Sequence, residues 1–295
     1  METAESEYDY IAHIDFGAVI AHAERCLFLA ANSAAFALLA AEATSLKTIC
    51  MPGALMTLND GGDVEAVSNA FPSWLAGMTF RDYVGRFSVF LEELAFIASL
   101  IHRSRNKNDT WSSEDTRKQL NRLNFPGKFD YLQKITQKTI PRRLRADLDS
   151  VIQARNCIEH RGGLVSRTDA QTGCLTLTWR AIEFIEQKTN GDRIVIKTLP
   201  HTIHEGNSML AQIVDRQKSF ALGEVVKFSG PEIWEIGFSL RAAVTKLVFM
   251  LQEFARPLSV QVNEPREVAD DEPQHKMDAG MQDARACLDY YPEND

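Results

Sequence analysis

The sequence predicts a mainly α-helical protein, a helical bundle with a small antiparallel β insert between its last two long helices. Two segments, at about 79–104 and 231–256, carry apolar residues at helical spacing, so each has an apolar face that must be covered. A third segment, 142–161, follows a proline and precedes two glycines, as helices commonly do. Between residues 163 and 229 the apolar residues tend to alternate, and β-branched and aromatic residues are enriched, which indicates strands.

The N-terminal part of the chain is less regular. Residues 1–8 are typical of a frayed end, and residues 9–47, rich in alanine and leucine, predict a helix. Residues 48–77 favour a connection with one short turn because of their helix-breaking residues, Pro52, Gly53, Gly61, Gly62, Pro72 and Gly77. We therefore expect an N-terminal helical segment and connection over residues 1–77.

The remaining elements follow from local signals. Short helices are expected at about 113–123 and 126–138, the second opened by Pro126. Four candidate strands make up the insert: 163–167, 174–185, 193–199 and 220–228. The chain thus divides into residues 1–77, a helical domain at 78–258 with its β insert at about 163–229, and an acidic disordered tail at 259–295.

Composition excludes several classes of protein. With 45% apolar and 24% charged residues in a chain of 295, the protein has ordinary globular composition. Its five cysteines are scattered and odd in number, which indicates neither a disulfide framework nor a zinc site, and we expect no metal and no cofactor. The same cysteine usage favours a reducing cytoplasm, and the longest apolar stretch, 16–39, is interrupted by His22, Glu24 and Arg25, so we expect no membrane association.

Charge is distributed unevenly along the chain. Residues 102–167 hold 15 basic and 7 acidic residues, a local charge of +8, whereas residues 1–101 carry −9 and the whole protein −8. A basic region on an acidic protein is typical of a surface that binds a polyanion such as RNA. The alternative is a solvated helical face that neutralises the acidic N-terminal part.

The basic region ends in the most informative stretch, Ala154 to Gly163, which contains Arg155, Asn156 and His160. An arginine clamps a phosphate with its planar fork of donors, and a histidine moves a proton near neutral pH. Together they suit the cleavage of a phosphodiester without a metal.

Arg155 lies on the stripe of its helix that should be apolar, which it shares with residues such as Leu148 and Val151. A charged group there needs a partner, either Glu159 one turn on, or a phosphate in a cleft or subunit interface. Arg155 and His160 point about 140° apart in an ideal helix. They meet one ligand only if the last turn loosens or a second copy supplies one of them.

This segment resembles the motif of the HEPN superfamily, an arginine followed directly by Asn, Asp or His and, a few residues on, by a histidine near a helix end. The resemblance covers about residues 80–256 and implies a HEPN-like helical bundle. It also implies a homodimer whose paired motif helices cleave RNA without a metal, by attack of the ribose 2′-hydroxyl. Members of this kind are toxins or antiphage defence effectors, held in check by an antitoxin or regulatory protein.

The resemblance assigns a role to each motif residue. His160 takes the 2′-hydroxyl proton or protonates the leaving 5′-oxygen, Arg155 stabilises charge on the phosphate, and Asn156 orients the histidine or binds substrate. We assign Arg161 and Arg145, on the same basic helix, to substrate binding, although an arginine at a helix C-terminus also interacts favourably with the helix dipole. For His160 the alternative is a histidine that caps the helix or is partly buried. For the whole chain the alternative is a non-catalytic HEPN-like module that dimerises, binds RNA or senses a ligand.

Overall fold

The computed structural model describes residues 14–43, 49–51, 54–56, 61–105, 112–170, 173–196 and 202–256. Within these residues the protein is mainly helical and carries a small antiparallel sheet, as the sequence predicts. The helices are α1 (Phe16–Ala43), α2 (Gly61–Arg105), α3 (Ser113–Arg122), α4 (Phe125–Thr136), α5 (Arg142–Arg161) and α6 (Gly230–Ala255). The strands are β1 (Ile49–Met51), β2 (Ala54–Met56), β3 (Cys174–Gln187), β4 (Arg193–Val195) and β5 (Ser208–Ala221).

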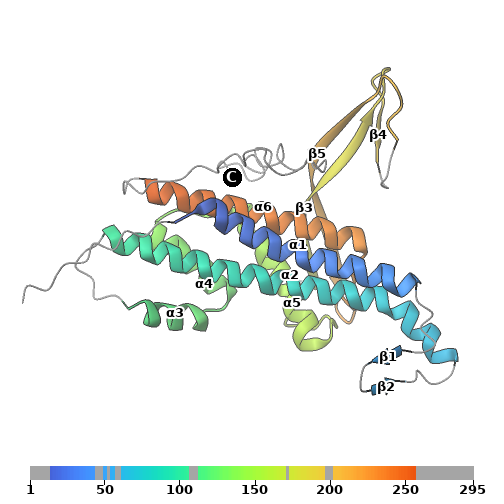
Figure 1. Ribbon diagram of the computed structural model, residues 1–295, viewed down its shortest axis with the longest axis horizontal. Helices are drawn as coiled ribbons and strands as arrows, with labels where there is room; N and C mark the ends of the chain where they lie inside the picture. Colours follow the sequence, from blue (N-terminus) through green and yellow to red (C-terminus); the bar gives the residue numbers. More distant parts are fainter. Residues whose placement is uncertain are drawn as a thin grey trace, which may run out of the picture.

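Three long helices, α1, α2 and α6, form the body of the bundle and lie alongside one another (Figure 1). Helix α2 also contacts α3, α4 and α5, so it is the common neighbour of the other helices. The predicted shared core of 79–104 and 231–256 is confirmed, because both helices contribute fully buried side chains to one cluster that includes Phe80, Leu94, Ile236 and Leu251.

Local caps explain where several helices begin. Helix α6 opens with a capping box, in which Ser229 and Glu232 each accept from the other residue's backbone N–H. The side chain of Ser112 caps α3, and that of Asn124 caps α4 by accepting from the N–H of Gly127 at 2.9 Å. These caps match the predicted helix starts to within one residue.

Helix α2 begins much earlier than the sequence predicts. The expected connection at 48–77 is wrong over residues 61–77, which continue the helix through Pro72. A proline inside a helix costs one backbone hydrogen bond, which is why the sequence predicts a break at Pro72. Here Ala76 is buried and α2 packs along α1, so packing in the bundle overrides the local signal, and within α2 itself Phe71 and Trp74 stack with ring centroids 5.8 Å apart.

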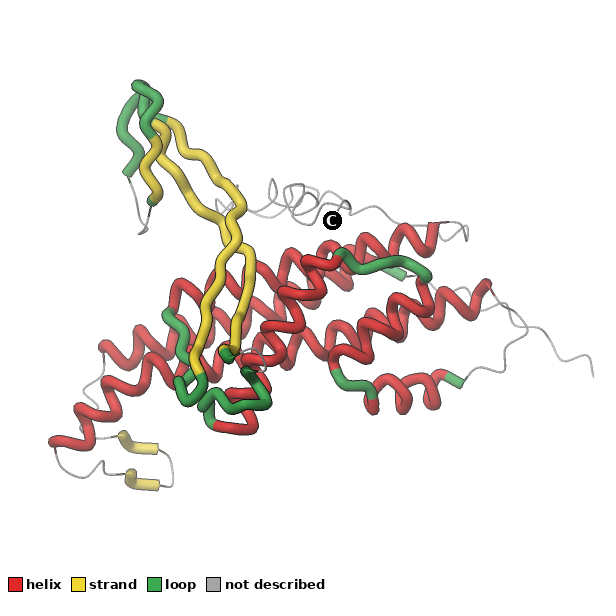
Figure 2. Tube along the Cα trace, turned by 180° about the vertical axis from the view of Figure 1, so that it is seen from behind, coloured by secondary structure: helices red, strands yellow, loops and turns green. Residues whose placement is uncertain are grey.

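The β insert is an arm that extends away from the bundle (Figure 2). Its strands run antiparallel in the order β4-β3-β5, and the β3–β5 pair continues in register from Cys174↔Ala221 to Gln187↔Ser208. Near the bundle, alternate residues of β3 are buried against α5 and α6: Leu175, Leu177, Trp179 and Ala181. The arm is therefore anchored at one end only.

The strand predictions are confirmed in part. Strand 174–185 is present, the strand at 193–199 is described only over Arg193–Val195, and 163–167 contributes a single bridge between Leu164 and Val225. The prediction of a strand at 220–228 is wrong, because β5 occupies Ser208–Ala221 instead. Most of β5 is exposed, so its sequence lacks the apolar alternation that marks a half-buried strand.

Neither the expected frayed end at 1–8 nor the expected tail at 259–295 lies within the described residues. The expected boundary between residues 77 and 78 falls inside the continuous helix α2.

Among the described glycines, Gly237 in α6 has the least room for a side chain, because it faces Tyr83 of α2. A Cβ on Gly237 would lie 2.8 Å from the ring of Tyr83, a buried side chain whose pKa burial raises to about 12. In contrast, a Cβ on Gly77 in α2 would meet nothing within 4 Å.

We expect opposite effects from the two matched substitutions. Gly237→Ala should lower the free energy of unfolding by about 1–3 kcal/mol, because the added methyl overpacks the contact. Gly77→Ala should raise it by about 0.5–1 kcal/mol, because alanine favours the helix and has room. Urea unfolding of both variants checks this, and a stabilised Gly237→Ala protein would contradict the close approach.

Candidate functional site

Helix α5 carries the Arg-Asn-x3-His motif and has the bounds that the sequence predicts, Arg142–Arg161. It ends where Gly162 adopts a left-handed conformation (φ 60°) and the N–H of Gly163 donates to the carbonyl of Cys157 at 3.1 Å. Its buried face packs against α2 and β3.

A buried polar contact ties α5 to the arm. The hydroxyl of Thr178 in β3 donates to the carboxylate of Asp147 at 2.7 Å, and the backbone N–H of Thr178 donates to the hydroxyl of Ser150 at 3.0 Å. Asp147 is 2% exposed, and Arg143 lies 3.3 Å from it. Burial raises the pKa of Asp147, although the hydrogen bond from Thr178 and the charge of Arg143 oppose the shift.

Arg155 is paired with an acid on its own helix. Its guanidinium forms an ion pair with Glu159, one turn on, and its Nη1 also donates to the Oδ1 of Asn156 at 3.2 Å. Glu159 in turn lies 3.8 Å from the guanidinium of Arg81 in α2. The intrahelical ion pair that the sequence left open is thus present, and Arg81 extends it to a second helix.

An open hollow of about 470 Å³ lies over this ion pair, between α1, α2 and α5. The charged residues that line it are two bases and two acids: Arg81, Arg155, Asp82 and Glu159. Asp82 also pairs with Arg86 at 2.8 Å. Arg155 is thus exposed on the side that faces the hollow, and the carboxylates of Glu159 and Asp82 balance the positive charge of the two arginines.

His160 lies at the end of α5, exposed to solvent, and is not among the residues that line the hollow. Within the part of the chain that the structure describes, its imidazole makes no hydrogen bond and no ion pair. A single chain therefore does not bring Arg155 and His160 to one common space. This follows from the helix itself, since residues five apart point to different faces.

Arg161 and Arg145 are engaged in ion pairs. The Nε of Arg161 donates to Asp169 at 2.7 Å, and Asp169 also accepts from the backbone N–H and the hydroxyl of Ser166. This arrangement closes the loop that follows α5.

Arg145, in α5, contacts residues of both α5 and α4. It donates to Asp149 at 3.0 Å and to Asp130 at 3.0 Å, and its guanidinium lies 5.0 Å from the ring centroid of Phe129. The Arg145–Asp149 pair has i,i+4 spacing and is readable from the sequence. Asp130 and Asp169 join their arginines only through the tertiary fold, and no local signal identifies them.

Comparisons with known proteins do not add to this description: no protein-family model matches the chain, and neither curated proteins nor solved structures give a match.

In the described ranges, no group of three or more His, Cys, Asp or Glu side chains is placed to hold a metal ion. No described helix combines the length and apolar character needed to cross a bilayer.

The Arg161–Asp169 contact predicts a pH-dependent contribution to stability. Burial by itself would raise the pKa of Asp169, but the hydrogen bonds from Ser166 and the charge of Arg161 outweigh it and leave the pKa below the usual value of 3.8. A carboxyl group with a lowered pKa stabilises the fold above its unfolded pKa, and this contribution is lost as the pH falls through the folded pKa.

We therefore expect Asp169→Asn to lower the free energy of unfolding by about 1–2 kcal/mol at pH 7, with a smaller difference from the wild type near pH 3. Thermal melts at both pH values check this. Glu93→Gln, which neutralises an exposed carboxylate on α2, is the control and should have little effect. An equal loss at the two pH values would contradict the assignment.

Proposed function

We propose that this chain is a metal-independent endoribonuclease that acts as a homodimer. The observation that carries the proposal is that one helix end offers both chemical groups to solvent, Arg155 in the open hollow and His160 exposed one turn further on. The segment 102–167, with its charge of +8, contains both residues and supplies the electrostatic attraction for RNA. The HEPN-like motif supports the same activity, and with it a cytoplasmic toxin or antiphage effector restrained by a partner protein.

A second copy is part of the proposal because one chain does not join the two groups. In a twofold dimer that apposes two α5 ends, Arg155 of one protomer meets His160 of the other, and this happens twice by symmetry. The angle of about 140° between Arg155 and His160 around the axis of one helix then does not prevent them from binding the same phosphate. A shared groove also excludes water from the phosphate more fully than an exposed helix end does.

The reaction uses only this chain's own side chains. His160 accepts the proton of the ribose 2′-hydroxyl while the 2′-oxygen attacks phosphorus and the bond to the 5′-oxygen breaks, and the protonated imidazole then returns its proton to that 5′-oxygen. The products are a 2′,3′-cyclic phosphate and a 5′-hydroxyl. Arg155 stabilises the charge on the phosphate oxygens, and for this it exchanges its bond to Glu159 for a bond to phosphate.

A non-catalytic module is the second candidate, and one observation favours it. The three arginines of α5 assigned to RNA chemistry, Arg145, Arg155 and Arg161, are each paired with a carboxylate. A bundle in which these pairs persist would dimerise, bind RNA weakly or sense a ligand without cleaving it.

The first experiment measures cleavage of RNA in the presence of EDTA. Arg155→Ala and His160→Ala should each lower the rate by about 100-fold or more, because each removes a group that acts in the transition state. DNA of the same sequence should remain intact, since it lacks the 2′-hydroxyl. Cleavage that persists in both variants would locate the activity elsewhere and contradict the proposal.

Mixing the two inactive variants tests the composite site directly. If Arg155 and His160 come from different protomers, a mixed dimer keeps one intact site of two. With random exchange of equal amounts, about one quarter of the wild-type activity should return. No recovery, despite mixed dimers shown by native mass spectrometry, would overturn the arrangement in trans.

A third prediction concerns Glu159, the carboxylate that pairs with Arg155. Glu159→Gln should strengthen RNA binding by about two- to tenfold at low salt, because Arg155 is released from its acidic partner. Fluorescence anisotropy with a labelled RNA measures this, and Glu93→Gln serves as the charge-matched control. Unchanged binding in Glu159→Gln would favour the non-catalytic module.

A further inference from the structure

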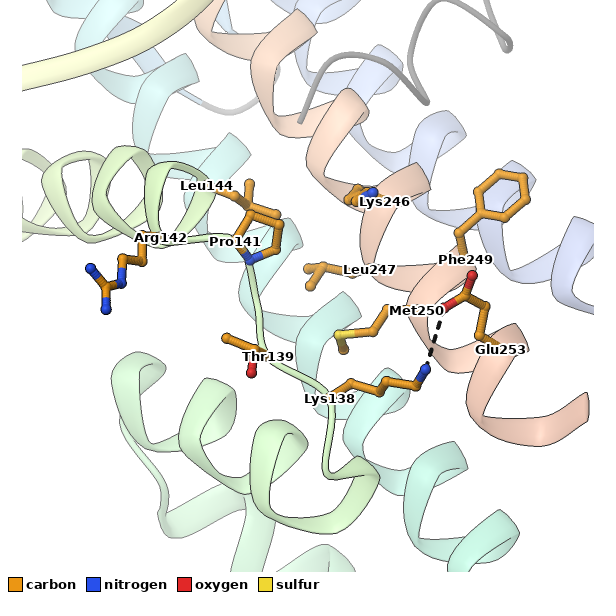
Figure 3. A pocket seen from close by; sticks show the side chains of 10 residues that line it. All are labelled: Lys138, Thr139, Pro141, Arg142, Leu144, Lys246, Leu247, Phe249, Met250 and Glu253. Carbon is orange, nitrogen blue, oxygen red and sulfur yellow. Dashed lines mark ion pairs between the residues drawn. The ribbon is translucent and has the colours of Figure 1, made fainter. Parts of the chain in front are cut away.

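We propose that a pocket at the other end of α5 binds a small anion with an aromatic body. The pocket has a volume of about 680 Å³ and lies between α6 and the connection that leads from α4 into α5 (Figure 3). This volume is within the usual range for small-molecule sites. The proposal does not depend on the ribonuclease activity.

Basic residues predominate around this pocket. Lys138, Arg142 and Lys246 line it, and Glu253 is its only acidic lining residue among those described. Lys138 reaches across to Glu253, with Nζ 3.5 Å from the carboxylate, and both side chains are 45% exposed (Figure 3). Arg142 and Lys246 form no ion pair in the described ranges, and the lining residues together carry a net charge of +2, with the Arg142 guanidinium turned outward at the rim (Figure 3).

The start of α5 adds to this positive character. Pro141 precedes the helix and caps it with no side-chain hydrogen bond, and the first turn contains no acidic residue. The first N–H groups of a helix have no partner within it, and the helix dipole favours an anion there. Most helix starts carry an acid or a capping side chain, whereas this one begins with Arg142; the next residue, Arg143, is paired with Asp147 and Asp215.

Apolar side chains form the remaining wall. Leu144 and Leu247 are buried beneath the pocket, and Phe249 and Met250 are partly exposed beside it. A partly exposed phenylalanine and a thioether offer a surface on which a flat ring packs well. Cations beside an apolar wall are suited to an aromatic compound that carries a phosphate or carboxylate group.

The pocket is separate from the motif. Arg142 and Arg155 lie 13 residues apart on one helix, which corresponds to about 20 Å along its axis. A small molecule held here does not touch the hollow beside Arg155. Its site is thus independent of the proposed cleavage.

Isothermal titration of the full chain with 1-naphthyl phosphate tests the proposal. We expect saturable binding at one site per chain, with weaker binding of inorganic phosphate and of uncharged 1-naphthol, because each lacks one half of the recognised chemistry. A parallel titration with 1-naphthoate tells a phosphate site from a carboxylate site. No saturable binding of either anion up to about 1 mM, or equal binding of 1-naphthol, would overturn the proposal.

Two variants locate the site. Arg142→Gln with Lys246→Gln should weaken binding by about fivefold or more, because two positive charges of the pocket lining are lost. Met250→Glu should abolish it by placing a carboxylate in the pocket, with the fold verified by circular dichroism. The matched control, Lys134→Gln with Arg167→Gln, removes the same net charge from exposed positions outside the pocket. An equal loss of affinity in this control would show non-specific attraction and reject the site.

Discussion

The burial of one face of α5 between α2 and β3 is the constraint on which the rest of the structure depends. The apolar side of α5 joins the common core through Leu144, Leu148 and Val151, and the Asp147–Thr178 hydrogen bond fixes the helix against the base of the arm. Because a buried carboxylate without a partner is costly, this contact specifies both the register of β3 and the rotation of α5. The rotation in turn decides which motif residues face outward.

With that rotation set, Arg155 emerges at the edge of the buried face, where α1 and α2 leave a hollow. A guanidinium in this half-buried position needs an acceptor, and Glu159 supplies it within the same helix. The same carboxylate reaches towards Arg81, so the ion pair also connects α5 to the central helix. Under the proposed function, a phosphate that binds Arg155 competes with this network of Glu159 and Arg81.

The two ends of α5 differ in character. The motif end holds a balanced set of charges and an exposed imidazole, whereas the N-terminal end has Arg142 and Lys246, which form no ion pair within the described ranges, beside an apolar wall. One helix thus connects a proposed reaction site with a proposed ligand site at about 20 Å. Both sites border long helices of the same core, since α2 lines the first and α6 the second.

The sequence by itself determined the helical class, the bounds of α5 and the shared core of α2 and α6, because these depend on local signals. Apolar spacing, Pro141 and Gly162 act over a few residues and are readable without a fold. The i,i+4 partner of Arg155 was also within reach of the sequence, since a charged residue on an apolar stripe needs a neighbour one turn away. Tertiary structure alone decided that Pro72 lies inside a helix, that β5 occupies 208–221, and that Arg161 pairs with Asp169. These three features depend on contacts between elements or on the exposure of a strand. The local periodicity from which elements are predicted does not contain information about such contacts or about exposure.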